Sequence, residues 1–168
     1  MNTGQRSIEE RLTRLEDIEE IKQLKGRYAE FLDTGYDPEG VAGLFADDGR
    51  WVIEGVTIRG AEAIKAQCRK LAKNQPWACH NITPTVIELA EDGTHATGSF
   101  YILAFLTMRD GSGQDGAFFL PGIFKDEFVK ENGRWFIQEV RSHIRQAAPW
   151  TEGWVKGEFA TGFFDLKD

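Results

Sequence analysis

The sequence predicts an α+β fold in which a curved antiparallel or mixed β-sheet wraps around a long N-terminal helix to form a cone. Apolar residues recur every three or four positions over residues 8–32, which indicates one long amphipathic helix. From residue 80 onward, long runs of β-branched and aromatic residues alternate with turn signals, which indicates a meander of strands. Such a sheet must cover its apolar face, and the first helix is the long amphipathic element available for this. A bent sheet around a helix leaves an apolar cavity at its open end.

The first helix is marked by signals at both ends. Ser7 with Glu10, and Asp17 with Glu20, have the spacing of capping boxes, and Gly35 is a natural C-terminal stop. The apolar stripe consists of Ile8, Leu12, Leu15, Ile18, Ile21, Leu24, Tyr28 and Leu32. We therefore expect an amphipathic helix with a bend near Asp17, whose apolar face packs against the sheet.

Shorter elements follow the first helix. Asp37 and Pro38 open a short second helix that is expected to reach Phe45. Residues 50–58 are predicted to form two short strands, and residues 61–73 form a helix. The strands of the meander are predicted over residues 81–89, 94–108, 117–130 and 134–144, with a bulge at Pro121-Gly122 in the third of them.

The length of 168 residues suits one domain with a sizeable core. We expect residues 1–148 to form the cone and residues 149–168 to be a C-terminal tail of the same domain. The aromatic residues of the tail are Trp150, Trp154, Phe159, Phe163 and Phe164. Because such side chains are rarely left in water, the tail is predicted to close the cavity mouth or to contact another subunit of a homo-oligomer, a dimer or a trimer. The alternative is a tail that packs on its own domain away from the cavity.

Charge and motif content exclude several classes of protein. A net charge of −7 disfavours nucleic acid and anionic membranes as partners, and no apolar run approaches the roughly 18 residues of a membrane span. The N-terminus has no apolar signal-peptide core, and Cys68 and Cys79 are interpreted as reduced thiols, so we expect a cytoplasmic protein. The sequence has no nucleotide-binding or zinc-protease motif, and we expect neither a cofactor nor a metal.

Asp33, His80 and Tyr28 are the candidate catalytic residues. Asp33 ends the first helix, where the helix dipole disfavours a carboxylate by roughly 0.3–1 kcal/mol, so it needs a partner. His80 begins a strand that should line the cavity, and it is either satisfied by a backbone carbonyl or held by Asp33 as a general base. The hydroxyl of Tyr28 either lies at the edge of the core or points into the cavity as a donor. His95 follows a turn and is expected in solvent.

The last strand carries three basic residues at alternating positions, Arg141, His143 and Arg145, which share one face of a regular strand. Arg141 has the same parity as Trp135, which is expected in the core, so the three are candidate substrate-binding residues. The alternative is that Arg141 pairs with Asp126 or Glu139 at the surface, and that Arg145 lies beyond the strand in solvent.

Several motifs resemble the SnoaL-like branch of the nuclear transport factor 2-like superfamily. They are residues 17–28 (DIEEIKQLKGRY), 32–33 (LD), 44–48 (LFADD), 59–60 (RG), 122–130 (GIFKDEFVK) and 133–137 (GRWFI). The resemblance covers residues 8–145 and implies the cone fold. The first helix is most similar to a group that holds bile-acid dehydratases, scytalone dehydratases and lindane dehydrochlorinases, in which an Asp–His pair abstracts a proton.

The resemblance also implies roles for individual residues. Asp33 and His80 match the proton-abstracting pair, and Tyr28 matches the dehydratase tyrosine. The substrate-binding candidates are Arg145, which stands nearest to the position of the family arginine, then Arg141, His143, Trp51 and Tyr101. This chain departs from the dehydratases at Ala104, where they have an acidic residue, and at Trp51 or Ile53, where they have a second tyrosine.

Two functions follow. The first is a cofactor-independent lyase or isomerase, in which His80 removes a proton next to a carbonyl or a leaving group, Asp33 holds His80, and Tyr28 stabilises the oxyanion. The abundance of Phe and Trp suggests a bulky apolar, aromatic or steroid-like substrate. The second is a non-catalytic small-molecule-binding or assembly subunit, like the β-subunit of ring-hydroxylating dioxygenases, which shares the fold. The Asp–His pair favours the first.

Overall fold

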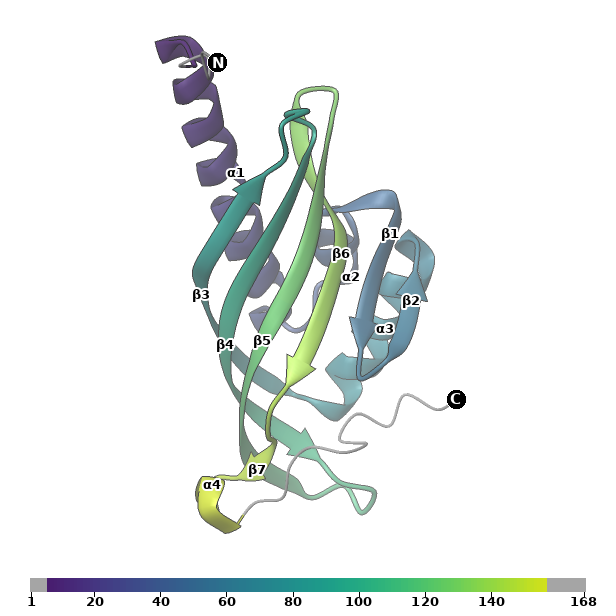
Figure 1. Ribbon diagram of the computed structural model, residues 1–168. Helices are drawn as coiled ribbons and strands as arrows, with labels where there is room; N and C mark the ends of the chain where they lie inside the picture. The colour runs from purple at the N-terminus through teal and green to yellow at the C-terminus, as the bar shows by residue number, and fades with distance from the viewer. Residues whose placement is uncertain (1–5, 157–168) are drawn as a thin grey trace.

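The computed structural model describes residues 6–156 of the chain (Figure 1). Its elements are α1 (Ile8–Asp33), α2 (Pro38–Ala42), β1 (Phe45–Ile53), β2 (Val56–Arg59), α3 (Ala61–Asn74), β3 (Trp77–Leu89), β4 (His95–Arg109), β5 (Asp115–Glu131), β6 (Arg134–Ile144), β7 (Ala148–Pro149) and α4 (Gly153–Lys156). The strands form a curved, unclosed sheet in the order β2-β1-β6-β5-β4-β3, and β7 pairs with β5. β1 and β6 run parallel, whereas the other neighbouring pairs are antiparallel.

Helices α1, α2 and α3 lie along one face of this sheet, which we call the inner face; the opposite face is the outer face (Figure 1). The core fills the space between the helices and the inner face, and its largest side chains come from both layers, among them Tyr28, Phe100, Phe128 and Trp135. The predicted cone of a mixed sheet around a long N-terminal helix is therefore confirmed.

Helix α1 begins at the predicted capping box, in which Ser7 and Glu10 accept each other's backbone N–H groups. The Asp17–Glu20 spacing does not start a second helix, because both carboxylates bind the sheet instead. Asp17 accepts hydrogen bonds from Lys130 Nζ at 2.6 Å and from Trp135 Nε1 at 2.8 Å. The turns before Asp17 project beyond the sheet (Figure 1), which leaves the predicted apolar residues of this half exposed, namely Ile8, Leu12 and Leu15.

A β-bulge in β6 decides which side chains of this strand face the core. Glu127 and Phe128 of β5 pair with Glu139 and Ile137, so Gln138 is an extra residue between them. Before the bulge Trp135 faces inward, and after it the even-numbered residues do. β5 itself runs through Pro121 and Gly122 in unbroken register with β4, so the bulge predicted there was wrong.

The described part of the C-terminal tail packs on the outer face, away from the inner face. β7 pairs with β5, and the ring of Trp150 lies 6.1 Å from that of Phe105, while Trp154 lies 6.3 Å from Phe119, as measured between ring centroids. Trp150 and Trp154 remain 64% and 74% exposed. Within residues 149–156 the tail thus does not close a cavity between helix and sheet; the predicted contributions of Phe159, Phe163 and Phe164 fall outside the described residues.

Two smaller differences concern the chain before the meander. The second helix ends at Ala42, so Phe45 belongs to β1. β1 also extends through the Asp47–Gly49 segment, which had the composition of a turn.

Across residues 6–156, none of the helices is long and apolar enough to span a membrane.

Candidate active site

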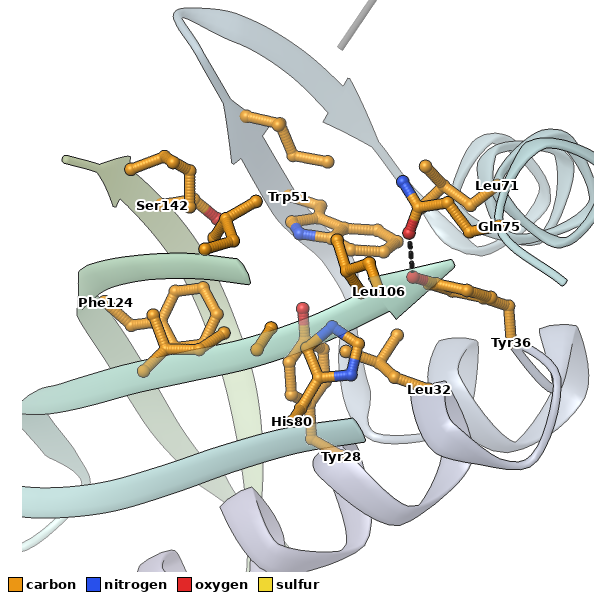
Figure 2. A pocket seen from close by; sticks show the side chains of 15 residues that line it. Tyr28, Leu32, Tyr36, Trp51, Leu71, Gln75, His80, Leu106, Phe124 and Ser142 are labelled. Atoms are coloured by element: carbon orange, nitrogen blue, oxygen red, sulfur yellow. Dashed lines mark hydrogen bonds between the residues drawn. The ribbon is translucent and has the colours of Figure 1, made fainter. Parts of the chain in front are cut away.

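A cavity of about 50 Å³ lies between α1, the end of α3 and the inner face of the sheet (Figure 2). Most of its walls are apolar and come from all three layers. Its polar groups are those of Tyr28, Tyr36, Gln75, His80 and Ser142, and the indole of Trp51 also lines it. A cavity of this size and polarity has room for water molecules.

Asp33 and His80 make the contact that the sequence predicted. Asp33 Oδ1 lies 2.6 Å from His80 Nδ1, and the backbone N–H of His80 donates to both carboxylate oxygens, at 2.9 and 3.0 Å. The contact joins the last residue of α1 to β3. These N–H donors compensate the carboxylate for its unfavourable place at the negative end of the helix dipole.

The hydrogen bond to Asp33 also sets the tautomer of His80. An ionised carboxylate only accepts hydrogen bonds, so in the neutral imidazole the proton belongs on Nδ1 and the lone pair on Nε2. The His80 side chain is only 9% exposed and lines the cavity, where Figure 2 shows its ring among the apolar walls. The arrangement is that of a general base held by an orienting carboxylate.

The structure places the ring of Tyr28 in the core and its hydroxyl at the cavity. Its ring is core, with edge-on contacts to Phe45, Trp51 and Phe124, and the residue is 1% exposed. Its hydroxyl points into the cavity beside the His80 ring (Figure 2). Burial raises the pKa of Tyr28 well above its usual value, so the hydroxyl stays protonated and can donate a hydrogen bond.

A buried ion pair lies beneath Tyr28, and the sequence analysis missed it. Lys25 Nζ is 2.8 Å from Asp126 Oδ2, and neither side chain is more than 2% exposed. The ammonium also lies 4.2 Å from the centroid of the Tyr28 ring and 4.4 Å from that of Phe124. Burial lowers the pKa of Lys25 and raises that of Asp126. The available signal was the position of Asp126 between Phe124 and Phe128, which alternate into the core.

Arg141 and His143 of β6, and Arg145 just beyond its end, are not in the cavity, which corrects the prediction for these three residues. The bulge at Gln138 reverses the parity of the strand, so Ser142 and Ile144 line the cavity while the three basic residues lie exposed on the outer face. Arg141 pairs with Glu139, as in the surface alternative.

Tyr101 is likewise on the outer face, 48% exposed, with the guanidinium of Arg145 5.7 Å from its ring centroid. Of the five substrate-binding candidates, Trp51 lines the cavity.

Tyr36 and Gln75 line the cavity beside His80, and the sequence analysis missed both. Tyr36 follows Gly35 at the end of α1, and both have left-handed backbone angles, with φ of 57° and 87°. This turn directs the Tyr36 ring inward, where it meets the His80 ring edge-on at 6.2 Å and its hydroxyl donates to Gln75 Oε1 (Figure 2). The Tyr36 pKa is raised by burial, so this hydroxyl too is a donor.

Similarity to solved structures supports the fold assignment. A hexachlorocyclohexane dehydrochlorinase, LinA type 2, has a TM-score of 0.74 at 18% identity and covers 82% of this chain and 91% of its own. A candidate scytalone dehydratase from Novosphingobium aromaticivorans has a TM-score of 0.72 at 20% identity, over 82% and 90% of the chains. A protein of unknown function from Mycobacterium tuberculosis has a TM-score of 0.62 at 27% identity, over 79% and 74%.

No protein of curated function matches the chain by sequence. The model of the SnoaL-like domain, in contrast, matches residues 13–141, a range that runs from α1 into β6 and includes Tyr28, Asp33 and His80. The chain therefore belongs to the SnoaL-like domain family.

Proposed function

We propose that this protein is a cofactor-independent lyase or isomerase that abstracts a proton from a carbon next to a carbonyl group. The observation that carries the proposal is the His80 imidazole, which is held by Asp33 through Nδ1 and lines an apolar cavity. The Tyr28 hydroxyl, which points into the same cavity, supplies a donor for the oxygen that becomes negative (Figure 2).

In the proposed step His80 Nε2 takes the proton, and the electron pair of the broken C–H bond forms the C=C bond of an enolate. Tyr28 donates a hydrogen bond to the enolate oxygen, and Asp33 stabilises the imidazolium. An isomerase then returns the proton from Nε2 to another carbon, whereas a lyase expels a leaving group from the β-carbon, which takes up that proton. The names of two neighbours, a dehydrochlorinase and a candidate dehydratase, favour elimination.

The cavity volume limits the size of the substrate. An apolar cavity of about 150 Å³ holds one benzene molecule, whereas this cavity measures about 50 Å³. We therefore propose a small carbonyl compound as the substrate. A compound of the size of benzene already requires the walls of the cavity to separate somewhat, and a polycyclic or steroid-like substrate, as the sequence suggested, would require far more separation.

The test is hydrogen–deuterium exchange at the carbon next to the carbonyl, followed by NMR in deuterated water. The substrates are ketones of increasing size, from acetone and butanone to cyclohexanone and tetralone, and free imidazole at equal concentration is the blank. We expect the protein to exceed the blank with the smaller ketones. If it exceeds the blank with none of them, proton abstraction next to a carbonyl is not its activity.

The alternative is a non-catalytic binding or assembly subunit. The observation in its favour is the outer face, where Tyr101, Leu103, Trp150 and Trp154 are all exposed. An assembly subunit should form an oligomer in light scattering that Trp154→Glu dissociates, and it should show no exchange with any ketone. Exchange by the dissociated variant would favour the enzyme.

A further inference from the structure

The amide of Gln75 is a buried donor that the proposed proton abstraction does not use. Gln75 follows the last turn of α3, is only 3% exposed, and lines the cavity. Its backbone N–H is satisfied by the carbonyl of Leu71, and its side-chain oxygen accepts from Tyr36. Within the described range, residues 6–156, no protein atom accepts a hydrogen bond from Gln75 Nε2.

Tyr36 contacts the oxygen end of this amide. Its hydroxyl donates to Gln75 Oε1, so Nε2 lies on the side of the amide away from Tyr36 (Figure 2). Tyr36 has a left-handed backbone conformation, with φ of 57°, which residues other than glycine rarely adopt. Such conformations persist where the surrounding structure holds them, and they gather at functional sites.

An unpaired amide N–H₂ in a buried position is costly, because it has lost its hydrogen bonds to bulk water. Water in the cavity can satisfy Nε2 in the free protein, and a ligand with an acceptor atom can replace that water. The Tyr28 hydroxyl is a second buried donor that lines the same cavity. Among residues 6–156, no protein atom accepts a hydrogen bond from it. The cavity therefore combines one base, His80, with two separate donors.

We propose that Gln75 is a specificity-determining residue that donates a hydrogen bond to a second oxygen of the substrate, with Tyr36 as its positioning residue. This rests on the proposed function and deepens it. The substrate class narrows to carbonyl compounds that carry a further acceptor oxygen, such as β-hydroxy ketones. Tyr28 takes the carbonyl oxygen, and Gln75 takes the hydroxyl oxygen.

The experiment compares two probes, butanone and the β-hydroxy ketone with the same carbon skeleton, by their kcat/KM for exchange of the hydrogens next to the carbonyl. We expect Gln75→Leu to reduce the preference for the hydroxy ketone by about tenfold, the value of one lost hydrogen bond, and to leave butanone within about twofold. Tyr36→Phe, which keeps the ring but frees the amide, should reduce the preference by about threefold.

Gln67 provides the matched control, because it is a buried glutamine of α3 whose Nε2 is also unpaired but which does not line the cavity. Gln67→Leu should leave the preference unchanged. If Gln75→Leu and Gln67→Leu affect the two probes alike, the proposal for Gln75 is wrong, while exchange of butanone would still support the proposed function.

A second measurement does not depend on turnover or on the folding of a variant. The side-chain amide resonances of Gln75 in the wild-type protein should shift when the hydroxy ketone is added and should shift much less with butanone. A shift without exchange would uphold Gln75 as a donor and reject proton abstraction. Equal responses to both probes would overturn the role of Gln75.

Discussion

Two Asp–His pairs in this molecule have nearly the same geometry. Asp33 Oδ1 lies 2.6 Å from His80 Nδ1, and Asp92 Oδ2 lies 2.8 Å from His95 Nδ1. In both pairs the carboxylate also accepts the backbone N–H of the histidine. The hydrogen bond alone therefore does not distinguish a candidate site from an ordinary turn.

The surroundings distinguish them. His80 and Asp33 are 9% and 30% exposed and join β3 to the end of α1, whereas His95 and Asp92 are 63% and 51% exposed in one turn. In the exposed turn, water and salt screen the interaction between the carboxylate and the imidazole. At the cavity the same interaction takes place in a medium of lower dielectric constant, beside the Tyr28 hydroxyl. Placement by the fold, and not the contact itself, makes the first pair a candidate site.

The largest effect is expected from removing each histidine in turn. His80→Ala should slow the ketone exchange by about 10³-fold, because the base is lost. His95→Ala, its matched control, should leave the rate within about twofold. NMR exchange rates at equal protein concentration measure both, and an equal loss in the two variants would break the comparison.

The ion pair beneath Tyr28 is almost fully buried, with neither side chain more than 2% exposed. Lys25→Met leaves the Asp126 carboxylate buried without its partner, which should lower the free energy of unfolding by roughly 3–5 kcal/mol. The double variant Lys25→Met/Asp126→Leu removes both charges and should recover most of that loss. Urea denaturation measures both, and a double variant as unstable as the single one would contradict this interpretation.

The carboxylates provide a third comparison. Asp33→Asn keeps the shape, but its amide donates to His80 Nδ1 and moves the proton to Nε2, the wrong tautomer for a base. We expect the exchange rate to fall about 10²-fold, while the free energy of unfolding stays nearly the same. Asp92→Asn is the control, and a rate loss in this variant would show that the effect is not specific to the cavity.

The smallest effect concerns the pH dependence of the exposed pair. The backbone N–H of Thr94, followed by the His95 side chain, lowers the pKa of Asp92 from 3.8 to about 2. Because the folded pKa is below the unfolded one, the carboxylate stabilises the fold above about pH 4, and this stabilisation is lost as the pH falls towards 2. Asp92→Asn should therefore be slightly less stable than the wild type at neutral pH and equal to it near pH 2 in urea denaturation. If the Asp92 carboxyl group titrated with a midpoint near 4 in the folded protein, this explanation of the pH dependence would be wrong.

The local pattern of the chain predicted much of this protein. Apolar periodicity identified α1, runs of β-branched and aromatic residues identified β3 to β6, and the Ser7–Glu10 capping box marked the start of α1. The contact between Asp33 and His80 followed from the helix-end position of Asp33 and from the family resemblance. These features depend on neighbours along the chain, or on a pattern shared with relatives.

The tertiary structure alone decided which side chains meet in the cavity. One extra residue at Gln138 turned Arg141 outward and Ser142 inward, and a bulge of this kind depends on the pairing of β6 with β5, not on the composition of β6. The left-handed turn at Tyr36 and the end of α3 bring together Tyr36 and Gln75, which are 39 positions apart. The apolar periodicity of the sequence does not predict such contacts, because they arise from packing between segments that are distant in the chain.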